Sequence, residues 1–405
     1  MAINRILERE HEIAVQEEVT YGTDPGAVVA GDFFKAQLAP DAVQRAIARA
    51  DRDQDRDYAQ ASVLSTQKGR ESATITIPGD VIPSGNGTTP TEPDMDLLFK
   101  AVFGSKHKAT AHTTTAAGSA GVSLNLTAGG VVASGLAVGD IFAVDVSATV
   151  GYEARQVAAL PGGDVVTLDR AFTTDPAAGR TVKVGTTYLL LNSALISVYV
   201  KRFLAGTIVR FALPGVVLPD MEISVDTAQD TPIAKVSFSG RGKAEIVHTD
   251  ARPTPTTAGQ PLAPEKTLVW FDSGAAPKKF CIAGQASLHV NNGIELRENE
   301  GCSLQPTGPK RTGNSSRYMV EATLQLLATT GDQDTIAIYN AIQAFVYQDV
   351  LVQLGTTPGS IVAWRCARFL PEPGLTSRDG ELGLNIGGGR CYGVAGDDEV
   401  RLAFI

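Results

Sequence analysis

The sequence has few cysteines and few aromatic residues, and it lacks long hydrophobic runs. None of its four cysteines, Cys281, Cys302, Cys366 and Cys391, belongs to a Cys-x-x-Cys pair or shows zinc-site spacing. This pattern predicts isolated core thiols in a reducing cytoplasm. No stretch approaches the ~18 consecutive apolar residues of a membrane span, and residues 1–12 are charged. We therefore expect no membrane contact, no secretion signal, and a chain that stays soluble in the cytosol.

Signatures of common catalytic and cofactor sites are also missing. The chain contains no Gly-x-Ser-x-Gly, no P-loop and no His-Glu-x-x-His. Gly387-Gly388-Gly389 lacks a following Lys-Ser/Thr, which favours a tight turn over a phosphate cradle. His107 and His112 lie in a stretch rich in Ala, Thr and Gly, where metal ligands would lack rigid support. The sequence predicts no catalytic residue, no cofactor and no metal site, so an enzyme is not expected.

The chain does contain many turn-forming residues. It has 41 glycines and 21 prolines in 405 residues, and 43% of its residues are hydrophobic. Such a length accommodates two or three domains, and frequent turns favour many short strands. Composition therefore predicts a β-rich protein with real cores.

The net charge is −9, from 44 acidic and 35 basic residues. A protein that grips nucleic acid normally carries a basic surface, so this balance argues against tight binding of DNA or RNA. An acidic surface suits a DNA conduit, because repulsion keeps the polymer from adhering to the wall. A simple contribution to solubility is the more ordinary explanation of the same charge.

The N-terminal third of the chain shows several local signals. Residues 1–34 are interpreted as an arm, and Asp41 caps a predicted helix over 42–50. Residues 72–78 alternate as a strand does. A polar loop is expected over 78–93, and apolar residues at helical spacing predict a helix that begins near Met95 and ends at Gly104.

The middle of the chain is interpreted as an inserted domain over 106–190. Residues 106–121 are almost all Ala, Thr, Gly and Ser and are typical of a linker. Short strands are predicted after it, at residues 122–126, 141–146, 153–159, 165–168 and 182–184. They predict a small all-β domain.

The C-terminal part combines strands with a short helix. Strands are expected at 196–203, 207–213, 221–225 and 233–240, a second polar loop at 250–266, and further strands from residue 267 onward. Alternation predicts a strand over 318–327, and Asp332 or Asp334 opens a short helix before a strand at 349–354. A Gly-rich hairpin and a strand over 400–405 close the chain. Nothing in this series of signals is typical of an active site.

Three further stretches connect this order to a known family. Residues 18–25 are Glu-Val-Thr-Tyr-Gly-Thr-Asp-Pro, and Leu97 to Gly104 form the short amphipathic helix. A Gly-x-x-Val strand at 206–209 leads to a strand ending Ser-Phe-Ser-Gly at 237–240. Together with the C-terminal series they resemble the tail tube, or major tail, proteins of long-tailed siphophages. The resemblance covers roughly 1–105 and 190–405; segment 106–190 departs from the compact family pattern.

The resemblance implies a fold and an assembly. The expected fold is mainly β: a β-sandwich or β-barrel core with a short flanking helix, formed by 1–105 and 191–405, plus the inserted all-β domain over 106–190, facing outward. Six copies would form a ring, and rings would stack into a hollow tube that delivers the genome. A ring would carry six times −9, or −54 formal charges. The loops at 78–93 and 250–266 are the candidates for contacts between rings.

The family also implies partners and a location. These are further copies of the chain, the tape measure protein, and the tail terminator and tail-tip proteins, in a virion tail assembled in the bacterial host cytoplasm. DNA would pass through without specific binding. The candidates for the lumen wall are four acidic residues, Asp220, Glu222, Asp226 and Asp230; the polar face of an ordinary sandwich explains them equally well. A β-rich surface or glycan-binding protein, with the insert as its recognition module, is the alternative function.

Overall fold

Antiparallel strands dominate the computed structural model, which confirms the mainly β fold. Three short α-helices accompany them among the described residues: α1 (Asp96–Phe103), α2 (Gly130–Ser134) and α3 (Thr335–Gln343). The structure describes residues 11–34, 44–49, 52–53, 66–67, 71–83, 89–191, 193–204, 209–227, 229–230, 232–254, 259–272, 277–298, 305–311, 319–327, 335–378 and 381–405.

A long bent strand, β15 (Val209–Asp226), connects the two halves of the main sheet. Its first half pairs with β14 and β17, and its second half pairs with β16 and β19. The pairing with β14 shifts register around Gly215, whose φ of 64° suits glycine best. The other strands of this region are β1 (His11–Glu17), β2 (Gln44–Arg49), β5 (Glu71–Asp80), β14 (Val198–Leu204), β16 (Lys235–Gly242) and β17 (Ile246–Val247).

Six strands of the C-terminal part form a closed circuit of pairings, in the order β18–β19–β22–β25–β24–β23 and back to β18. Their bounds are β18 (Thr267–Phe271), β19 (Lys278–Asn291), β22 (Met319–Leu327), β23 (Gln348–Leu354), β24 (Val362–Arg378) and β25 (Glu381–Tyr392). Apolar side chains from all six belong to the main hydrophobic core. The predicted short helix before residue 349 is α3, which packs beside β24.

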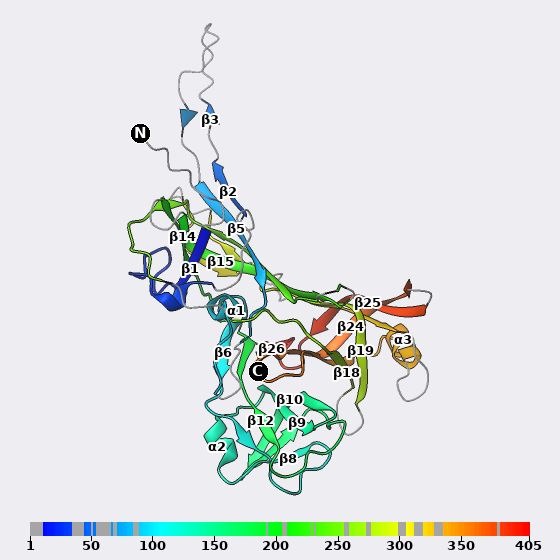
Figure 1. Cartoon of the computed structure of the whole chain (residues 1–405). Helices are drawn as coiled ribbons and strands as arrows, with labels where there is room; N and C mark the ends of the chain where they lie inside the picture. Colours follow the sequence, from blue (N-terminus) through cyan, green and yellow to red (C-terminus); the bar gives the residue numbers. More distant parts are fainter. Residues whose placement is uncertain are drawn as a thin grey trace.

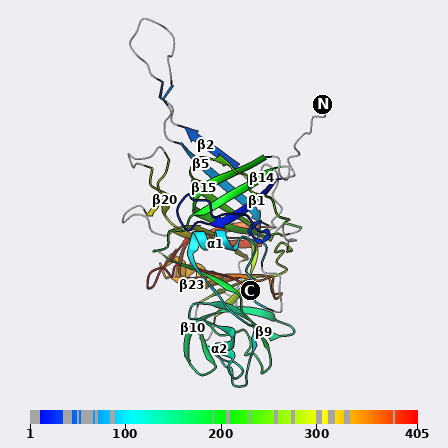
Figure 2. The ribbon, with the colours of Figure 1, turned by 90° about the vertical axis from the view of Figure 1, so that its left-hand side faces the viewer.

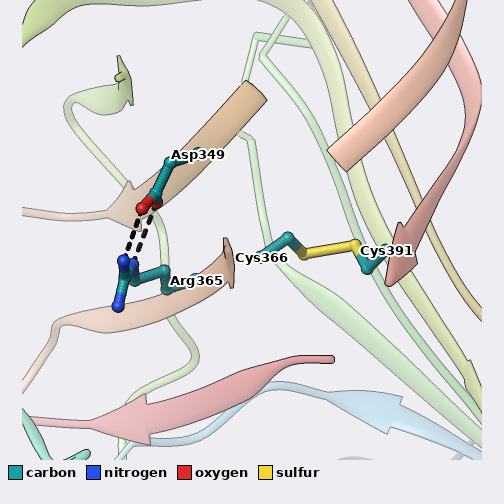
Figure 3. The surroundings of a disulfide bond; sticks show 4 residues. All are labelled: Asp349, Arg365, Cys366 and Cys391. Carbon is teal, nitrogen blue, oxygen red and sulfur yellow. Dashed lines mark hydrogen bonds and ion pairs between the residues drawn. A yellow bond between two sulfur atoms is a disulfide. The ribbon is translucent and has the colours of Figure 1, made fainter. Parts of the chain in front are cut away.

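A disulfide joins two strands of this circuit. Cys366 of β24 and Cys391 of β25 have Cα atoms 5.6 Å apart and are bonded through sulfur, as Figure 3 shows. Both are buried, whereas Cys281 is exposed. The prediction of isolated core thiols is therefore wrong for these three residues, and Cys302 lies outside the described residues. Spacing along the chain could not reveal the pair, because the fold alone brings residues 366 and 391 together.

The Gly-rich segment belongs to the same region and is not a tight turn. Gly387-Gly388-Gly389 lies inside β25, where the pairing register shifts and Gly388 has a φ of 59°. A Cβ on Gly389 would meet the ring of Phe369 at 2.3 Å, so the missing side chain makes room for that ring. The glycines form a bulge in a strand, and the turn prediction is wrong.

Helix α1 packs against the main core and ends as predicted at Gly104, whose N–H bonds to the carbonyl of Lys100. Beside it, β13 (Thr186–Leu190) pairs with β6 (Gly104–Lys108) and with β26 (Arg401–Phe404), which also pairs with β24. The predicted last strand therefore pairs within the subunit. The remaining short elements are η1 (Ala30–Asp32), β3 (Arg52–Asp53), β4 (Thr66–Gln67), β20 (Ile294–Leu296) and β21 (Pro309–Arg311).

The middle of the chain forms a separate six-stranded sheet with its own hydrophobic cluster. Its strands are β7 (Thr113–Thr114), β8 (Ser123–Asn125), β9 (Ile141–Ser147), β10 (Gly151–Gly162), β11 (Val165–Leu168) and β12 (Thr181–Lys183). All five predicted strands are present. The inserted domain is therefore shorter than the predicted segment 106–190, because β6 and β13, near the two ends of that segment, belong to the main sheet. The predicted linker over 106–121 is wrong, since it contains β6 and β7.

One side of this inserted sheet packs against the main sheet (Figures 1 and 2). An apolar cluster joins Ile141, Ala143 and Ala154 of the insert to Trp270 and Leu351 of β18 and β23. All five side chains are at most 1% exposed. The insert is therefore not a pendant domain on a flexible tether; it covers part of the main sheet.

Buried ions reinforce the same contact. Arg170, which is 0% exposed, donates to Asp169 (2.6 Å), to Asp349 of β23 (2.5 Å) and to the carbonyl of Trp270 (3.0 Å). Arg365 of β24 forms two hydrogen bonds with the same Asp349 (Figure 3). A buried ion is tolerated only when its partners replace the lost water. These contacts fix the position of the insert.

A second buried cation, Arg155 of β10, lies between the rings of Phe172 and Trp270, 4.7 and 4.8 Å from their centroids. Its guanidinium donates to Glu153 at 2.7 Å, and Lys279 of β19 donates to the same carboxylate at 2.7 Å. Residues from the insert and from the main sheet thus share one network of ions and aromatic rings.

The N-terminal residues are part of the fold. Strand β1 pairs with β14, and Ile13 and Val15 are at most 3% exposed. The turn that resembles the family motif is anchored by Lys201, whose buried ammonium donates to Asp24 and to the carbonyl of Gly26. For residues 11–34, the interpretation as a separate arm is therefore wrong.

Two local predictions nearby are also corrected. Residues 44–49 are the strand β2, paired with β5, and not a helix; residues 42, 43 and 50 of that prediction lie outside the described residues. Residues 78–80 of the loop predicted at 78–93 belong to β5, where they pair with β16. The N–H of Leu262 in the second predicted loop donates to the carbonyl of Val81, so the two segments contact each other within the chain. Pairing between distant segments decides both cases.

Candidate functional site

Three of the four predicted acidic residues lie on one face of β15. Asp220, Glu222 and Asp226 alternate with Met221, Ile223 and Val225, which are at most 2% exposed in the core. The period of two places the carboxylates on the polar side of the sheet. The fourth, Asp230, follows the strand as an exposed residue of a bend. The four acidic residues therefore lie on and beside a central strand as the sequence indicated, and three of them share one face of it.

Neighbouring strands complete a row of polar side chains across this face. Ser237 of β16 is opposite Glu222, Glu222 is opposite His289 of β19, His289 is opposite Glu321 of β22, and Glu321 is opposite Arg390 of β25. Directly opposite side chains in antiparallel strands have Cβ atoms about 4.5–5.5 Å apart and interact. The row brings together charges that are far apart in the sequence.

His289 is the central member of the row, and the sequence indicated only that it lies on a strand face. Its Nε2 is 2.9 Å from Asp220 Oδ1, and the amide of Asn291 donates to the same oxygen at 2.9 Å. The hydrogen bond to Asp220 raises the pKa of His289 above its ordinary value of 6.5, and the negative charges of Glu222 and Glu321 add to this effect, while burial opposes it.

The face carries cations as well as carboxylates. Lys235 of β16 is opposite Asp80 of β5, and Arg241 forms an ion pair with Glu298 at 2.9 Å. Arg390 lies 3.7 Å from Glu321. The surface is therefore mixed in sign, and the predicted acidic residues are only one part of it. The positive charges come from neighbouring strands. Which residues lie opposite each other across those strands cannot be predicted from local sequence patterns.

A cavity of about 440 Å³ opens beside the row, next to β20 and β21. Its lining includes Asp220, Arg241, Glu298, Glu295 and Lys310. Arg241 pairs with Glu298, and Lys310 lies 3.9 Å from Glu295. Because its charges already have partners within the chain, the cavity offers little to an ionic ligand.

The two histidines of the predicted linker have structural contacts. His107 Nδ1 is 2.8 Å from Asp140, and His112 Nδ1 accepts the N–H of Val184 at 3.2 Å. Burial lowers the pKa of His112 to about 4. Across the described part of the chain, no three His, Cys, Asp or Glu side chains gather as metal ligands.

A scan against protein-family models found no match, and a search of curated proteins found none either. Among the described residues, no helix is long and apolar enough to cross a membrane.

Proposed function

We propose that the chain is a structural subunit of a phage tail tube, and that it assembles into stacked rings around a hollow conduit for the genome. The rings contain six copies in this proposal. The tube belongs to the virion tail, is assembled in the bacterial host cytoplasm, and contacts the tape measure, tail terminator and tail-tip proteins. DNA passes through it without specific binding, and the subunit is not an enzyme.

A projecting arm, formed by the β3–β4 pair beyond the edge strand β2, is the observation that carries the proposal. Strand β2 is the edge of the main sheet beside β5, which itself pairs with β16, and the β3–β4 pair lies beyond this edge, away from the body (Figures 1 and 2). Among the described strands, β2 pairs with β5 alone. The β3–β4 pair is a sheet of only two strands, which is marginal in water, and the open edge of β2 tends to pair with another chain. Such an arm is stable when a neighbouring copy covers it.

The geometry of the arm fits a repeating assembly. It emerges at one end of the molecule, and the insert lies at the opposite end (Figure 1). A contact between two different surfaces of identical subunits is heterologous, so it closes rings or continues as a filament. Both outcomes are needed in a stacked tube.

The polar face of β15 and its neighbours is the candidate wall of the conduit. Among the described residues of this face, with His289 neutral, five negative and three positive charges occur: Asp80, Asp220, Glu222, Asp226 and Glu321 against Lys235, Arg241 and Arg390. A slight excess of negative charge repels a polyanion, and the interspersed cations keep the repulsion modest. This balance supports passage rather than binding.

Electron microscopy of the concentrated, purified chain tests the proposal. We expect tubes of uniform diameter in negative stain. A variant in which residues 50–70 are replaced by a short Gly-Ser turn should remain folded by circular dichroism but lose the tubes. The matched control adds the same Gly-Ser segment between Gly162 and Gly163, a turn of the insert, and should keep them. A strictly monomeric protein that binds glycans would refute the proposal and support the surface-binding alternative.

A further inference from the structure

His289 is surrounded by carboxylates from both neighbouring strands. Asp220 and Glu222 face it from β15, and Glu321 faces it from β22. Arg390 of β25 is the next charge along the row, on the far side of Glu321. Asn291, on the same strand as His289, shares the Asp220 oxygen with it. Three carboxylates thus surround one imidazole that changes its charge near neutral pH.

Because His289 lies between β15 and β22, its change of charge alters the electrostatic interaction between the carboxylates of these two strands. Its side chain is 34% exposed, so protons exchange readily, yet the strands on both sides hold it within reach of the three carboxylates. When it is neutral, the carboxylates of β15 and β22, on strands about 9–10 Å apart on either side of β19, repel each other with no positive charge between them. When it is protonated, it lies between them as a counter-charge.

We propose that His289 is a pH-responsive cation that draws the carboxylates of β15 and β22 together at mildly acidic pH and releases them as the pH rises. The group formed by Asp220, Glu222, His289, Glu321 and Arg390 then changes its formal charge from −1 to −2. If the face lines a conduit, which rests on the proposed function, every subunit makes its wall more negative above neutral pH.

The direction of the effect on stability follows from the raised pKa of His289. The folded state binds the proton more tightly than the unfolded chain, whose histidine titrates near the ordinary value of 6.5. The stabilisation is therefore fully present below that value and is lost as the pH rises through the raised pKa of the folded state.

Two variants with different charge separate this effect from packing. His289→Gln keeps a polar side chain but is neutral at every pH, and His289→Lys is positive throughout the neutral range. We expect the Tm of the native chain to exceed that of His289→Gln at about pH 5.5 and to approach it at about pH 9. His289→Lys should keep its advantage over His289→Gln at both values.

Titration by NMR measures the same group directly in the native chain. The pKa of His289 should exceed 6.5, whereas burial lowers the pKa values of His112 and His248, which act as internal references in the same spectra. Parallel Tm profiles of the native chain and His289→Gln, or a His289 pKa at or below 6.5, would overturn the inference. Both measurements use the unassembled chain, so their failure is distinct from a failure to form tubes.

Discussion

Replacing Arg170 by methionine should release the insert from the main sheet. Its guanidinium contacts Asp169, Asp349 and the carbonyl of Trp270 with no exposure to water. Removing one partner of a buried ion pair costs about 3–5 kcal/mol, because the remaining charge stays buried. Arg365 still lies 2.9 Å from Asp349 and 3.4 Å from Asp169. We therefore expect a loss of about 3 kcal/mol, at the lower end of that range.

Urea unfolding followed by tryptophan fluorescence measures this loss, since the ring of Trp270 lies in the contact between insert and main sheet. The matched control is Arg180→Met, which removes a partly exposed ion pair with Asp145 at 3.1 Å. A pair of this kind contributes about 0–1 kcal/mol. If the two variants lose the same free energy of unfolding, the buried network does not hold the insert and the reasoning is refuted.

Three further perturbations test other parts of the fold. Removing residues 1–30 deletes β1 and should abolish folding, as measured by circular dichroism, whereas removing residues 1–10 should leave the chain folded. A folded product from the first deletion would contradict the inference that pairing of β1 with β14 is needed for the fold. Replacing Cys366 and Cys391 by alanine should lower the free energy of unfolding under oxidising conditions by about 3.5 kcal/mol, because the bridge closes a loop of 25 residues in the unfolded chain. If reductant leaves the free energy of unfolding of the native chain unchanged, the bridge does not form. Asn292→Ala should cost about 2 kcal/mol in urea unfolding, because the carbonyls of Val102 and Leu218 lose their donor; a cost under about 0.5 kcal/mol would show that water replaces it.

Local patterns predicted most of the individual elements. The apolar spacing before Gly104 predicted α1, and alternation predicted the strands of the insert and the polar side of β15. These elements follow the sequence because their neighbours along the chain decide which side is buried. The helix predicted at 42–50 is wrong for its described residues 44–49, because pairing with β5 overrides local helix propensity.

The sequence by itself determined the mainly β fold, the positions of most strands, and the acidic side of β15. Only the tertiary structure decided which charges meet: Arg170 pairs with Asp349 at a separation of 179 residues, and His289 lies between carboxylates of two other strands. The physical reason is that strand alternation depends on adjacent residues, whereas register and packing depend on surfaces brought together by the whole chain.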